Sequence, residues 1–482
     1  MSTVVGEGAR RWWILAGASM GLFILMLDST TLPLALPSIR VELGASSSGL
    51  QWVQNVYLLT MAALVITLGR LGDMLGRKRI FQVGLVGFLA GSVISATAGS
   101  VGQLIGGRAV QGAGGAAILA LSLAIANLAF PPDERPRAVG IWAAVSAIAL
   151  AIGPLVGGIA VELVSWRLIF WLSVPPTLLA LAVMAVAAPE SRDEAAGARL
   201  DIPGFVTVTL GLGAVVLALV QGKPWGWDSP ATLGVLAAGL ALLGLFWIVE
   251  HRVSEPLVDF QLFRSRPYLG ATAAAFALVG SYWALMFYLP QYDELVLDHS
   301  TFASGLLVLP VTAPMVVISP LAGRLGARLG ARTLMTAGMG CATLGMLVIT
   351  GVAGGAGYVR LLPGLLLFGV ALGLVFATMS TAAMAALPPE KAGIASGVLA
   401  MNRTLAGALL LAVGGAIFQH IELERRRDGA SFDAAFADGL AGAAWLLTAV
   451  LAMGTLLTWL YVRSPRPERE SPVPHRPRHF HL

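Results

Sequence analysis

Cysteine is almost absent from the sequence, and this excludes two ways of holding a fold together. Cys341 is the only cysteine among 482 residues, so the chain can form neither a disulfide framework nor a zinc site of paired cysteines. Charge is scarce as well. Asp, Glu, Lys and Arg together make up 12% of the sequence, whereas soluble domains carry about 25%. The composition therefore argues against a soluble protein.

Nucleotide-binding motifs are also missing. No stretch matches the phosphate-binding pattern GxxxxGK[ST]. The glycines between positions 112 and 115 lie in an apolar helical segment with no preceding strand, so they do not form a dinucleotide site. We therefore expect no ATP site, no cofactor and no bound metal, and we do not expect an enzyme.

Long apolar segments dominate what is present. Hydrophobic residues make up 57% of the chain, and its mean hydropathy is +0.81. About 20 apolar residues are needed to cross a bilayer as a helix, and a helix is required because lipid offers no hydrogen bonds to the backbone. We predict fourteen membrane-spanning helices, at approximately 12–36, 50–69, 80–99, 102–127, 138–161, 168–188, 203–221, 230–249, 267–290, 303–323, 332–353, 361–386, 393–418 and 439–462.

Basic residues are distributed unevenly between the loops on the two sides. If the N-terminus is cytoplasmic, 22 of the 31 Lys and Arg residues lie on the cytoplasmic side, 7 lie outside and 2, Arg108 and Arg403, lie within spans. Cytoplasmic loops of membrane proteins carry such an excess, so both termini are predicted to be cytoplasmic. The pI near 9.6 then reflects topology, and no nucleic-acid partner is expected.

An internal repeat indicates a duplicated fold. The segment 69–79 is echoed by 323–332, and each copy lies between two spans, as expected for two parallel halves. The offset of the repeat exceeds the length of six helices and their loops by about fifty residues, which fits two inserted spans. We predict an all-α integral membrane protein with an N-terminal six-helix half at 1–190, a linker with two extra helices at 191–266, a C-terminal six-helix half at 267–462 and a disordered cytoplasmic tail at 463–482.

Several motifs together resemble one transporter family. The loop with Gly69, Gly72, Asp73, Gly76 and Arg77 resembles the signature loop of the major facilitator superfamily. Three further stretches resemble its fourteen-helix drug:proton antiporter branch, namely 27–37 with Asp28, 108–114 with Arg108 and Gln111, and the helix-five motif of Gly140, Gly153, Pro154, Gly157 and Gly158. The resemblance implies a major-facilitator fold and export of lipophilic, often cationic drugs or toxic metabolites in exchange for protons by alternating access. It also implies a multidrug efflux transporter of a bacterial cell membrane that works as a monomer.

Asp28 is the residue most directly tied to proton coupling. A carboxylate inside the bilayer costs at least a few kcal/mol and therefore marks a functional site. The helix rise of 1.5 Å per residue places Asp28, Arg108, Asn55 and Tyr57 at one level, roughly 8 to 12 Å from the external ends of their helices. We predict that Asp28 carries the proton, that Arg108 is its charge partner, and that Gln111, Asn55 and Tyr57 bond it or its waters. The alternative is a structural lock between helices.

Glycines and a loop aspartate suggest two moving contacts. Gly153-Pro154 and Gly157-Gly158 let the fifth helix bend and approach a neighbour, either for gating or for ordinary tight packing. Asp73 is predicted to latch the two halves together on the cytoplasmic side in the outward-open state, by facing a helix N-terminus. Ala327 replaces it in the second copy, so the latch is expected on one side only. The alternative is that the loop only determines topology.

The C-terminal half offers fewer polar candidates. The predicted substrate cavity consists of Gln51, Tyr282, Met286, Phe287, Asn402 and Arg403. Asp293 and Glu294 are a candidate second acidic site for cations, and the alternative is a solvated loop edge. Two other functions remain open, a proton-coupled exporter of lipids or glycolipids and a proton:solute symporter.

Overall fold

The computed structural model describes residues 7–193, 201–253, 256–352, 357–388 and 391–462, and these residues form helices and connecting loops without a strand. The predicted tail at 463–482 lies outside them. In the N-terminal half the helices are α1 (Glu7–Leu43), α2 (Ser47–Leu75), α3 (Arg77–Ala96), α4 (Val101–Leu128), α5 (Arg135–Leu163), α6 (Leu168–Trp171) and α7 (Val174–Ala187). They are followed by α8 (Ile202–Trp225), α9 (Pro230–Glu250), the 3-10 helix η1 (Phe260–Arg264), α10 (Arg266–Leu295), α11 (Thr301–Leu329), α12 (Ala331–Ile349), η2 (Thr350–Val352), α13 (Tyr358–Ala385), α14 (Ala392–Arg427) and α15 (Phe432–Tyr461).

Fourteen of these segments are long and apolar enough to cross a membrane, counting α6 and α7 as one. The predicted number of spans is therefore confirmed. Several helices extend beyond the predicted spans by five or more residues, and the largest extension is at the end of α14, where Arg425, Arg426 and Arg427 form the last helical turn beyond the predicted end at 418. Ion pairs explain the longer helix, since Arg426 lies 2.9 Å from Glu422 and Arg425 lies 2.8 Å from Asp438. Cations are also favourable at a helix C-terminus.

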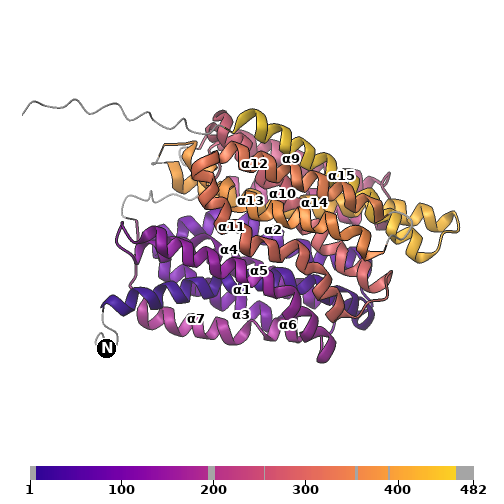
Figure 1. Cartoon of the computed structure of the whole chain (residues 1–482), viewed down its shortest axis with the longest axis horizontal. Helices are drawn as coiled ribbons and strands as arrows, with labels where there is room; N and C mark the ends of the chain where they lie inside the picture. Colours follow the sequence, from indigo (N-terminus) through magenta and orange to yellow (C-terminus); the bar gives the residue numbers. More distant parts are fainter. Residues whose placement is uncertain (1–6, 194–200, 254–255, 353–356, 389–390, 463–482) are drawn as a thin grey trace, which may run out of the picture.

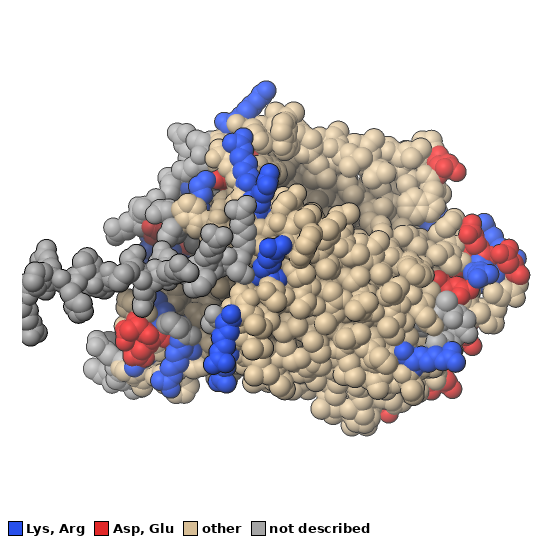
Figure 2. All heavy atoms as spheres, turned by 45° about the horizontal axis from the view of Figure 1, so that its top comes forward, with Lys and Arg blue, Asp and Glu red and all other residues tan. Residues whose placement is uncertain are grey.

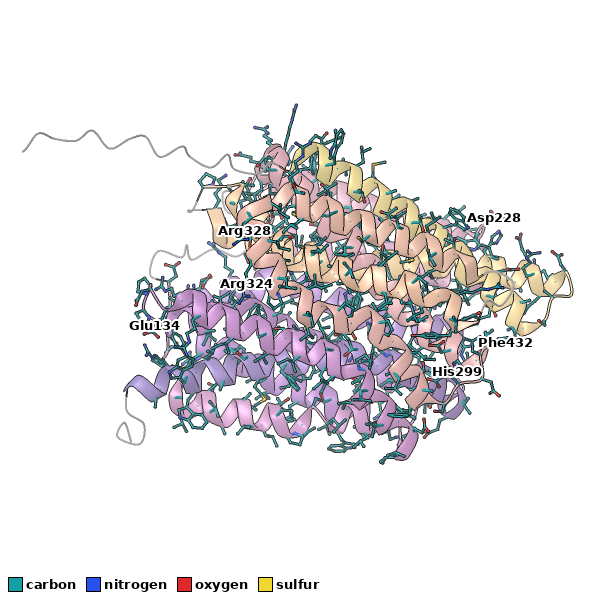
Figure 3. The ribbon with its side chains drawn as sticks, in the orientation of Figure 1. Glu134, Asp228, His299, Arg324, Arg328 and Phe432 are labelled. Atoms are coloured by element: carbon teal, nitrogen blue, oxygen red, sulfur yellow. The ribbon has the colours of Figure 1, made fainter. Side chains whose placement is uncertain are left out.

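The helices run back and forth between two ends of an elongated bundle (Figure 1). We call the end where α1 begins and α15 ends the terminal end, and the opposite end the distal end. Figure 3 marks Glu134 and Arg324 at the terminal end, and Asp228 and His299 at the distal end. Basic side chains gather at the terminal end, and a surface almost free of charge separates it from the distal charges (Figure 2). Such an uncharged band suits a bilayer.

The two sets of helices flank a seam. α1 to α7 lie in the lower part of Figure 1 and α10 to α15 in the upper part. Across the seam α5 packs against α11, and α2 packs against α14. The two extra helices, α8 and α9, pack against each other, and α8 also contacts both α2 and α14. The order of spans is thus six, two and six, while the exact domain bounds stay a prediction.

Candidate functional site

A buried ion pair joins α1 to α4. Asp28 is 4% exposed and Arg108 is fully buried. Nη1 of Arg108 donates to both carboxylate oxygens of Asp28, at 2.9 Å to Oδ1 and 2.7 Å to Oδ2. The structure therefore brings together the two residues predicted to couple protons, which are 80 positions apart in the sequence.

Other groups surround the guanidinium on several sides. Nη1 also donates to Oε1 of Gln111 at 2.9 Å, and Nε donates to the carbonyl of Val53 at 3.4 Å. The ring of Tyr57 lies under the guanidinium, with 4.1 Å between the guanidinium carbon and the ring centroid. A cation over an aromatic face gains about 2 kcal/mol when both groups are desolvated. Gln111 and Tyr57 therefore lie beside the pair, but the contacts they make are with Arg108, whereas bonds to Asp28 were predicted.

The network continues into residues that the sequence did not single out. Nε2 of Gln111 donates to Oγ of Ser92 at 2.8 Å, and Oγ of Ser173 lies 3.2 Å from the same atom. Close packing makes this possible, because a Cβ on Gly91 would lie 2.5 Å from the backbone nitrogen of Gln111. Serines in apolar helices carry no charge signal, so only the helix packing reveals that α3 and the α6–α7 segment support the pair.

Asn55 does not join the network. Its side chain is fully buried, and neither of its amide atoms has a hydrogen-bond partner. The expected bond from Asn55 to the pair is therefore wrong for this structure. The reason is helical geometry, since residues two positions apart point to different faces of a helix, and Tyr57 already faces Arg108.

The glycines of α5 make contact with α1. A Cβ on Gly153 would collide with Oγ1 of Thr30, and one on Gly157 would lie 3.0 Å from the Cα of Thr31. Both neighbours follow Asp28 within three positions of the chain. Gly140 belongs to the same motif, but a Cβ at this position would have no neighbour within 4 Å. Gly153 and Gly157, toward the distal end of α5, therefore pack closely against α1, whereas Gly140, toward the terminal end, has open space beside it.

The next part of the motif contacts the other half of the protein. A Cβ on Gly158 would lie 3.0 Å from the carbonyl of Thr301 and 3.1 Å from the Cα of Phe302. Gly305 of α11 approaches α5 equally closely, since a Cβ on it would lie 2.5 Å from the carbonyl of Pro154. The glycines therefore let α5 and α11 meet backbone to backbone at the distal end.

Hydrogen bonds also close the distal end between the halves. They join Arg40 to Gln291 at 3.4 Å, Gln51 to Tyr288 at 3.0 Å, and the Phe302 backbone nitrogen to the Glu162 carboxylate at 2.6 Å. We call these three bonds, together with the contact of α5 with α11, the distal gate. The gate is closed in this structure.

The glycine loop between α2 and α3 is anchored within its own half. Asp73 accepts a hydrogen bond from Nε of Arg77 at 2.7 Å, and its carbonyl accepts one from the nitrogen of Asp193 at 3.0 Å. Gly76, at φ +122°, lies against the Glu190 carboxylate, which accepts from the nitrogen of Lys78 at 3.0 Å. Gly72 packs on α4, and Gly69 lies near it. In this structure Asp73 thus pairs with the first residue of α3, within its own half. The latch itself was predicted for the outward-open arrangement and stays a prediction.

The residues expected to form one substrate cavity make contacts of different kinds. Tyr282, Met286 and Phe287 are buried in the packed core around α10. Gln51 belongs to the distal gate, and the guanidinium of Arg403 lies 5.4 Å from the ring centroid of Phe376. Asn402 donates to the carbonyl of Thr272 at 2.9 Å. That these six residues line one substrate cavity stays a prediction.

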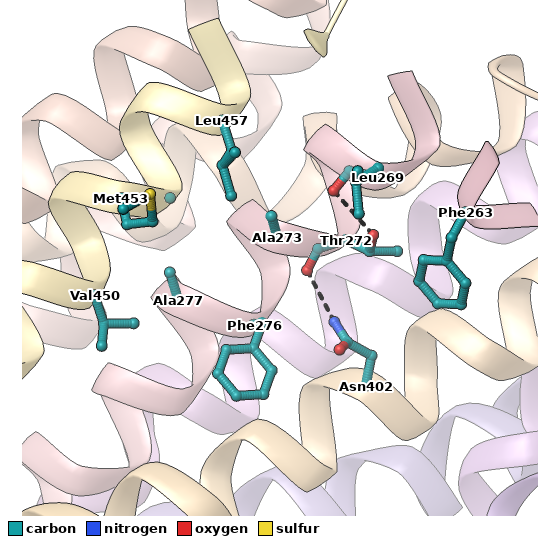
Figure 4. Close-up of a pocket in the computed structure, with 11 residues that line it drawn as sticks. Phe263, Leu269, Thr272, Ala273, Phe276, Ala277, Asn402, Val450, Met453 and Leu457 are labelled. Atoms are coloured by element: carbon teal, nitrogen blue, oxygen red, sulfur yellow. Dashed lines mark hydrogen bonds between the residues drawn. The ribbon is translucent and has the colours of Figure 1, made fainter. Parts of the chain in front are cut away.

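Asn402 lines a mostly apolar pocket of about 380 Å³ (Figure 4). Its walls come from η1, α10, α14 and α15, namely Phe263, Leu269, Thr272, Ala273, Phe276, Ala277, Asn402, Val450, Met453, Gly454 and Leu457. Asn402 and Thr272 provide its polar side chains. Met453 is 56% exposed on the outer surface of α15, so the pocket borders the membrane-facing side of the bundle.

The acidic pair at the distal end of α10 is not a solvated loop edge. Asp293 is fully buried, and neither of its carboxylate oxygens has a hydrogen-bond partner. Glu294 accepts a bond from Oγ1 of Thr301 at 3.0 Å through one oxygen only. The alternative of a solvated edge is therefore wrong for Asp293.

Known proteins resemble this chain over most of its length. The family model of the Major Facilitator Superfamily matches residues 18–411. The chain is 33% identical over 404 residues to multidrug resistance protein Stp of Mycobacterium tuberculosis, covering 84% of this chain and 75% of that protein. It is 32% identical over 472 residues to the puromycin resistance protein pur8 of Streptomyces alboniger, covering 95% of this chain and 93% of that protein.

Solved structures with the same fold include distant transporters. The xylose transporter XylE from E. coli, in a partially occluded inward-open conformation, superposes with a TM-score of 0.63 at 16% identity, covering 95% of this chain and 98% of that one. The POT family transporter PepTSo gives a TM-score of 0.66 at 15% identity, with coverages of 94% and 98%. These likenesses establish the fold, and the family model matches well over half of the sequence. The chain therefore belongs to the major facilitator superfamily.

Proposed function

We propose that this protein exports lipophilic, often cationic compounds from a bacterial cell in exchange for protons, by alternating access. Its relatives include a multidrug resistance protein, a puromycin resistance protein and a tetracenomycin C resistance and export protein. In this proposal the terminal end faces the cytoplasm, which agrees with the excess of Lys and Arg there. The proton gradient supplies the energy, without ATP or a cofactor, and a monomer in the cell membrane is sufficient.

The buried pair of Asp28 and Arg108 carries the proposal. In the structure each charge compensates the other. A proton on Asp28 would remove the negative charge and leave Arg108 buried without compensation, which costs several kcal/mol. The protonated protein would then favour an arrangement in which the guanidinium reaches water or another acceptor. Proton binding thereby shifts the conformational equilibrium, as a proton-driven cycle requires.

The closed distal gate supports the assignment of states. With the terminal end in the cytoplasm, this structure is closed to the outside. Opening to the outside must then separate α5 from α11, where Gly158 and Gly305 allow contact without side chains. A seam of small residues can part and re-form at low cost, because no large side chain has to leave a pocket.

The membrane-facing pocket supports a lipophilic ligand. Its volume of about 380 Å³ lies within the range of pockets that hold small molecules. Most of its walls come from the spans α10, α14 and α15, and η1 adds Phe263, so a compound dissolved in the bilayer would reach it from the side of α15. The same observation favours a second candidate, export of a lipid.

Everted membrane vesicles provide the test. Under a proton gradient, each compound of a panel of lipophilic cations, neutral antibiotics and lipids is added, and proton release is recorded together with uptake into the vesicles. We expect release with lipophilic cations and none in Asp28→Asn, which keeps the size of the side chain but cannot titrate. Asp228→Asn, in the exposed distal loop between α8 and α9, is the matched control. Wild-type proton release by Asp28→Asn would contradict the proposal.

A further inference from the structure

The Asp293 carboxyl group is buried without a partner, and the Asp28 site does not explain why. Asp293 is fully buried at the distal end of α10, and both of its carboxylate oxygens lack a partner. Its backbone carbonyl accepts a bond from the nitrogen of His299 at 3.1 Å, but this does not reach the carboxyl group. An ionised carboxylate buried without a partner costs several kcal/mol. In the closed arrangement the group must therefore hold a proton or a metal cation.

The surroundings of Asp293 are acidic and aromatic. Glu294 follows it in the chain, and Glu162 of α5 adds negative charge near Glu294. The phenol groups of Tyr292 on α10 and Tyr358 on α13 are close enough to feel the charge of Asp293. Asp433 of α15 acts on Tyr292 as well, and His299 has a buried ring nitrogen without a partner. Arg40 of α1 bonds Gln291 rather than Asp293. Three other arginines at this end pair with other acids, namely Arg167 with Glu42, Arg425 with Asp438 and Arg426 with Glu422.

The chemistry of the site favours a proton over a metal ion. Within the described ranges, no group of three or more His, Cys, Asp or Glu residues is arranged to hold a metal. Among the same residues no basic side chain forms an ion pair with Asp293. A single carboxyl group beside other acids can neutralise its charge by binding one proton.

Asp293 is connected to the distal gate through its neighbour. Glu294 accepts a bond from Thr301, the first residue of α11, and Gly158 of α5 packs against that residue. Phe302, the next residue, donates its nitrogen to Glu162 across the seam. The contacts of α5 with α11 therefore involve Thr301 and Phe302, and Thr301 is the residue that bonds Glu294. Hydrating Asp293 would require this packing to loosen.

We propose that Asp293 is a proton-binding site that holds the distal gate closed when its carboxyl group is protonated and lets the gate open when it is ionised. This rests on the proposed function for its orientation, in which the distal end faces outside. The proton comes from external water and returns to external water when the gate opens. Asp293 therefore senses external pH and carries no charge through the transport cycle. If the closed state alone binds this proton, the ratio of open to closed protein changes by up to about tenfold per pH unit.

A buried serine of the gate allows a direct test. Ser304 on α11 is fully buried, and its hydroxyl has no hydrogen-bond partner. Ser304→Cys is made in a Cys341→Ser background, and the rate of reaction with a membrane-impermeant thiol reagent is measured in right-side-out vesicles without substrate. The rate measured at Ser304→Cys is divided by the rate measured at Val41→Cys, which removes the pH dependence of the reagent itself. Val41 lies on α1 at the distal end and is 83% exposed.

We expect the normalised rate to fall at least about fivefold between about pH 8 and about pH 6. In Asp293→Asn, which resembles the protonated form, the rate should be low at both values and independent of pH. Asp298→Asn is the matched control from the following loop, since Asp298 is exposed and its φ of 56° is one that asparagine tolerates. It should keep the dependence of the parent protein.

Three results would overturn the proposal. One is a pH dependence that persists in Asp293→Asn, or in Asp293→Ser if the asparagine variant does not fold. Another is loss of the dependence in Glu294→Gln with Asp293 intact, which would assign the proton to Glu294. The third is a rate that changes when sodium replaces choline at constant pH, which would assign the site to a metal cation. Because no substrate or transport is involved, these outcomes are independent of whether Asp28 drives export.

Discussion

A single nitrogen of Arg108 holds both oxygens of Asp28. Nη1 donates at 2.7 Å and 2.9 Å, while Nη2 is buried without a hydrogen-bond partner. The pair therefore lacks the two parallel bonds of the strongest arginine–carboxylate geometry. Nη2 is therefore a donor that remains free to bond another acceptor if the guanidinium moves when Asp28 is protonated. The geometry suits a pair that forms and breaks during a cycle.

The first prediction concerns the stability of this pair. Arg108→Gln leaves the Asp28 carboxylate buried without its cation and should lower the free energy of unfolding by about 3 to 5 kcal/mol. The double variant Asp28→Asn with Arg108→Gln removes both charges and should recover most of that loss. Denaturant unfolding in detergent, followed by circular dichroism, measures the cycle. If the loss of stability in the double variant equalled the sum of the losses in the two single variants, the two charges would not stabilise each other.

The second prediction concerns the serine that supports Gln111. Ser92→Ala removes the acceptor of the Gln111 amide and should lower proton-coupled transport about five- to tenfold, since a buried hydrogen bond is worth about 1 kcal/mol. Ser95→Ala on the same helix is the control, because the Ser95 hydroxyl is buried but has no hydrogen-bond partner. It should transport at the parental rate. Equal transport rates for Ser92→Ala and Ser95→Ala would show that the Ser92 hydrogen bond does not contribute to proton coupling.

The sequence was sufficient to identify the residues whose charge is costly to place in the membrane. Asp28 and Arg108 stand out because charges inside spans are rare, and depth along the helices placed them at one level. Helical rise does not specify which face a residue occupies, and this is why Asn55 was placed beside the pair. The contribution of Ser92 depends on how closely α3 approaches α4, which is a property of packing.

The loop at 69–79 shows a second limit of sequence reasoning. Its glycines and basic residues are visible in the sequence, but the anchor for its backbone is Glu190, more than one hundred positions later. A carboxylate in a polar loop gives no sign of its partner. The burial of Asp293 was hidden for a similar reason, because a residue at the predicted end of a span is equally consistent with water and with a packed gate.

The third prediction separates glycines of one motif. Gly153→Ala would force its methyl group against Thr30 and should lower transport strongly, because overpacking costs about 1 to 3 kcal/mol. Gly140→Ala has open space and should transport at the parental rate. Adding Thr30→Ser to Gly153→Ala removes a methyl group but keeps the clashing hydroxyl, whereas Thr30→Ala removes the hydroxyl and should restore transport in part. Equal activity of the Gly153 and Gly140 variants would show that the close contact is not needed.

The fourth prediction concerns the latch. Asp73 is partly exposed and pairs with Arg77 here, so Asp73→Asn should change stability by no more than about 0.5 kcal/mol. Transport should nevertheless fall, because the outward-open arrangement would lose its contact at the terminal end. Disulfide crosslinking between cysteines at Leu75 and Ile394, both exposed near that end, should drop in the variant. Ala327→Asp should not restore it, and unchanged crosslinking in Asp73→Asn would argue against the latch.

The last prediction concerns the energetics of exchange. With Asp28 as the one proton carrier and Asp293 returning its proton to the same side, each cycle exchanges one proton for one substrate molecule. A monovalent cation then moves without net charge, and only the pH gradient drives it, at about 1.4 kcal/mol or tenfold accumulation per pH unit. A neutral substrate moves one net charge and also draws on the membrane potential, at about 2.3 kcal/mol per 100 mV. Proteoliposomes with the potential clamped by potassium and valinomycin, and the pH gradient varied separately, distinguish the two cases. If the steady-state gradient of a monovalent cation followed the potential, a second proton would have to cross the membrane in each cycle.

The variant Asp293→Asn then shows whether Asp293 carries that second proton. If it does, the steady-state gradient of the cation no longer depends on the membrane potential in this variant.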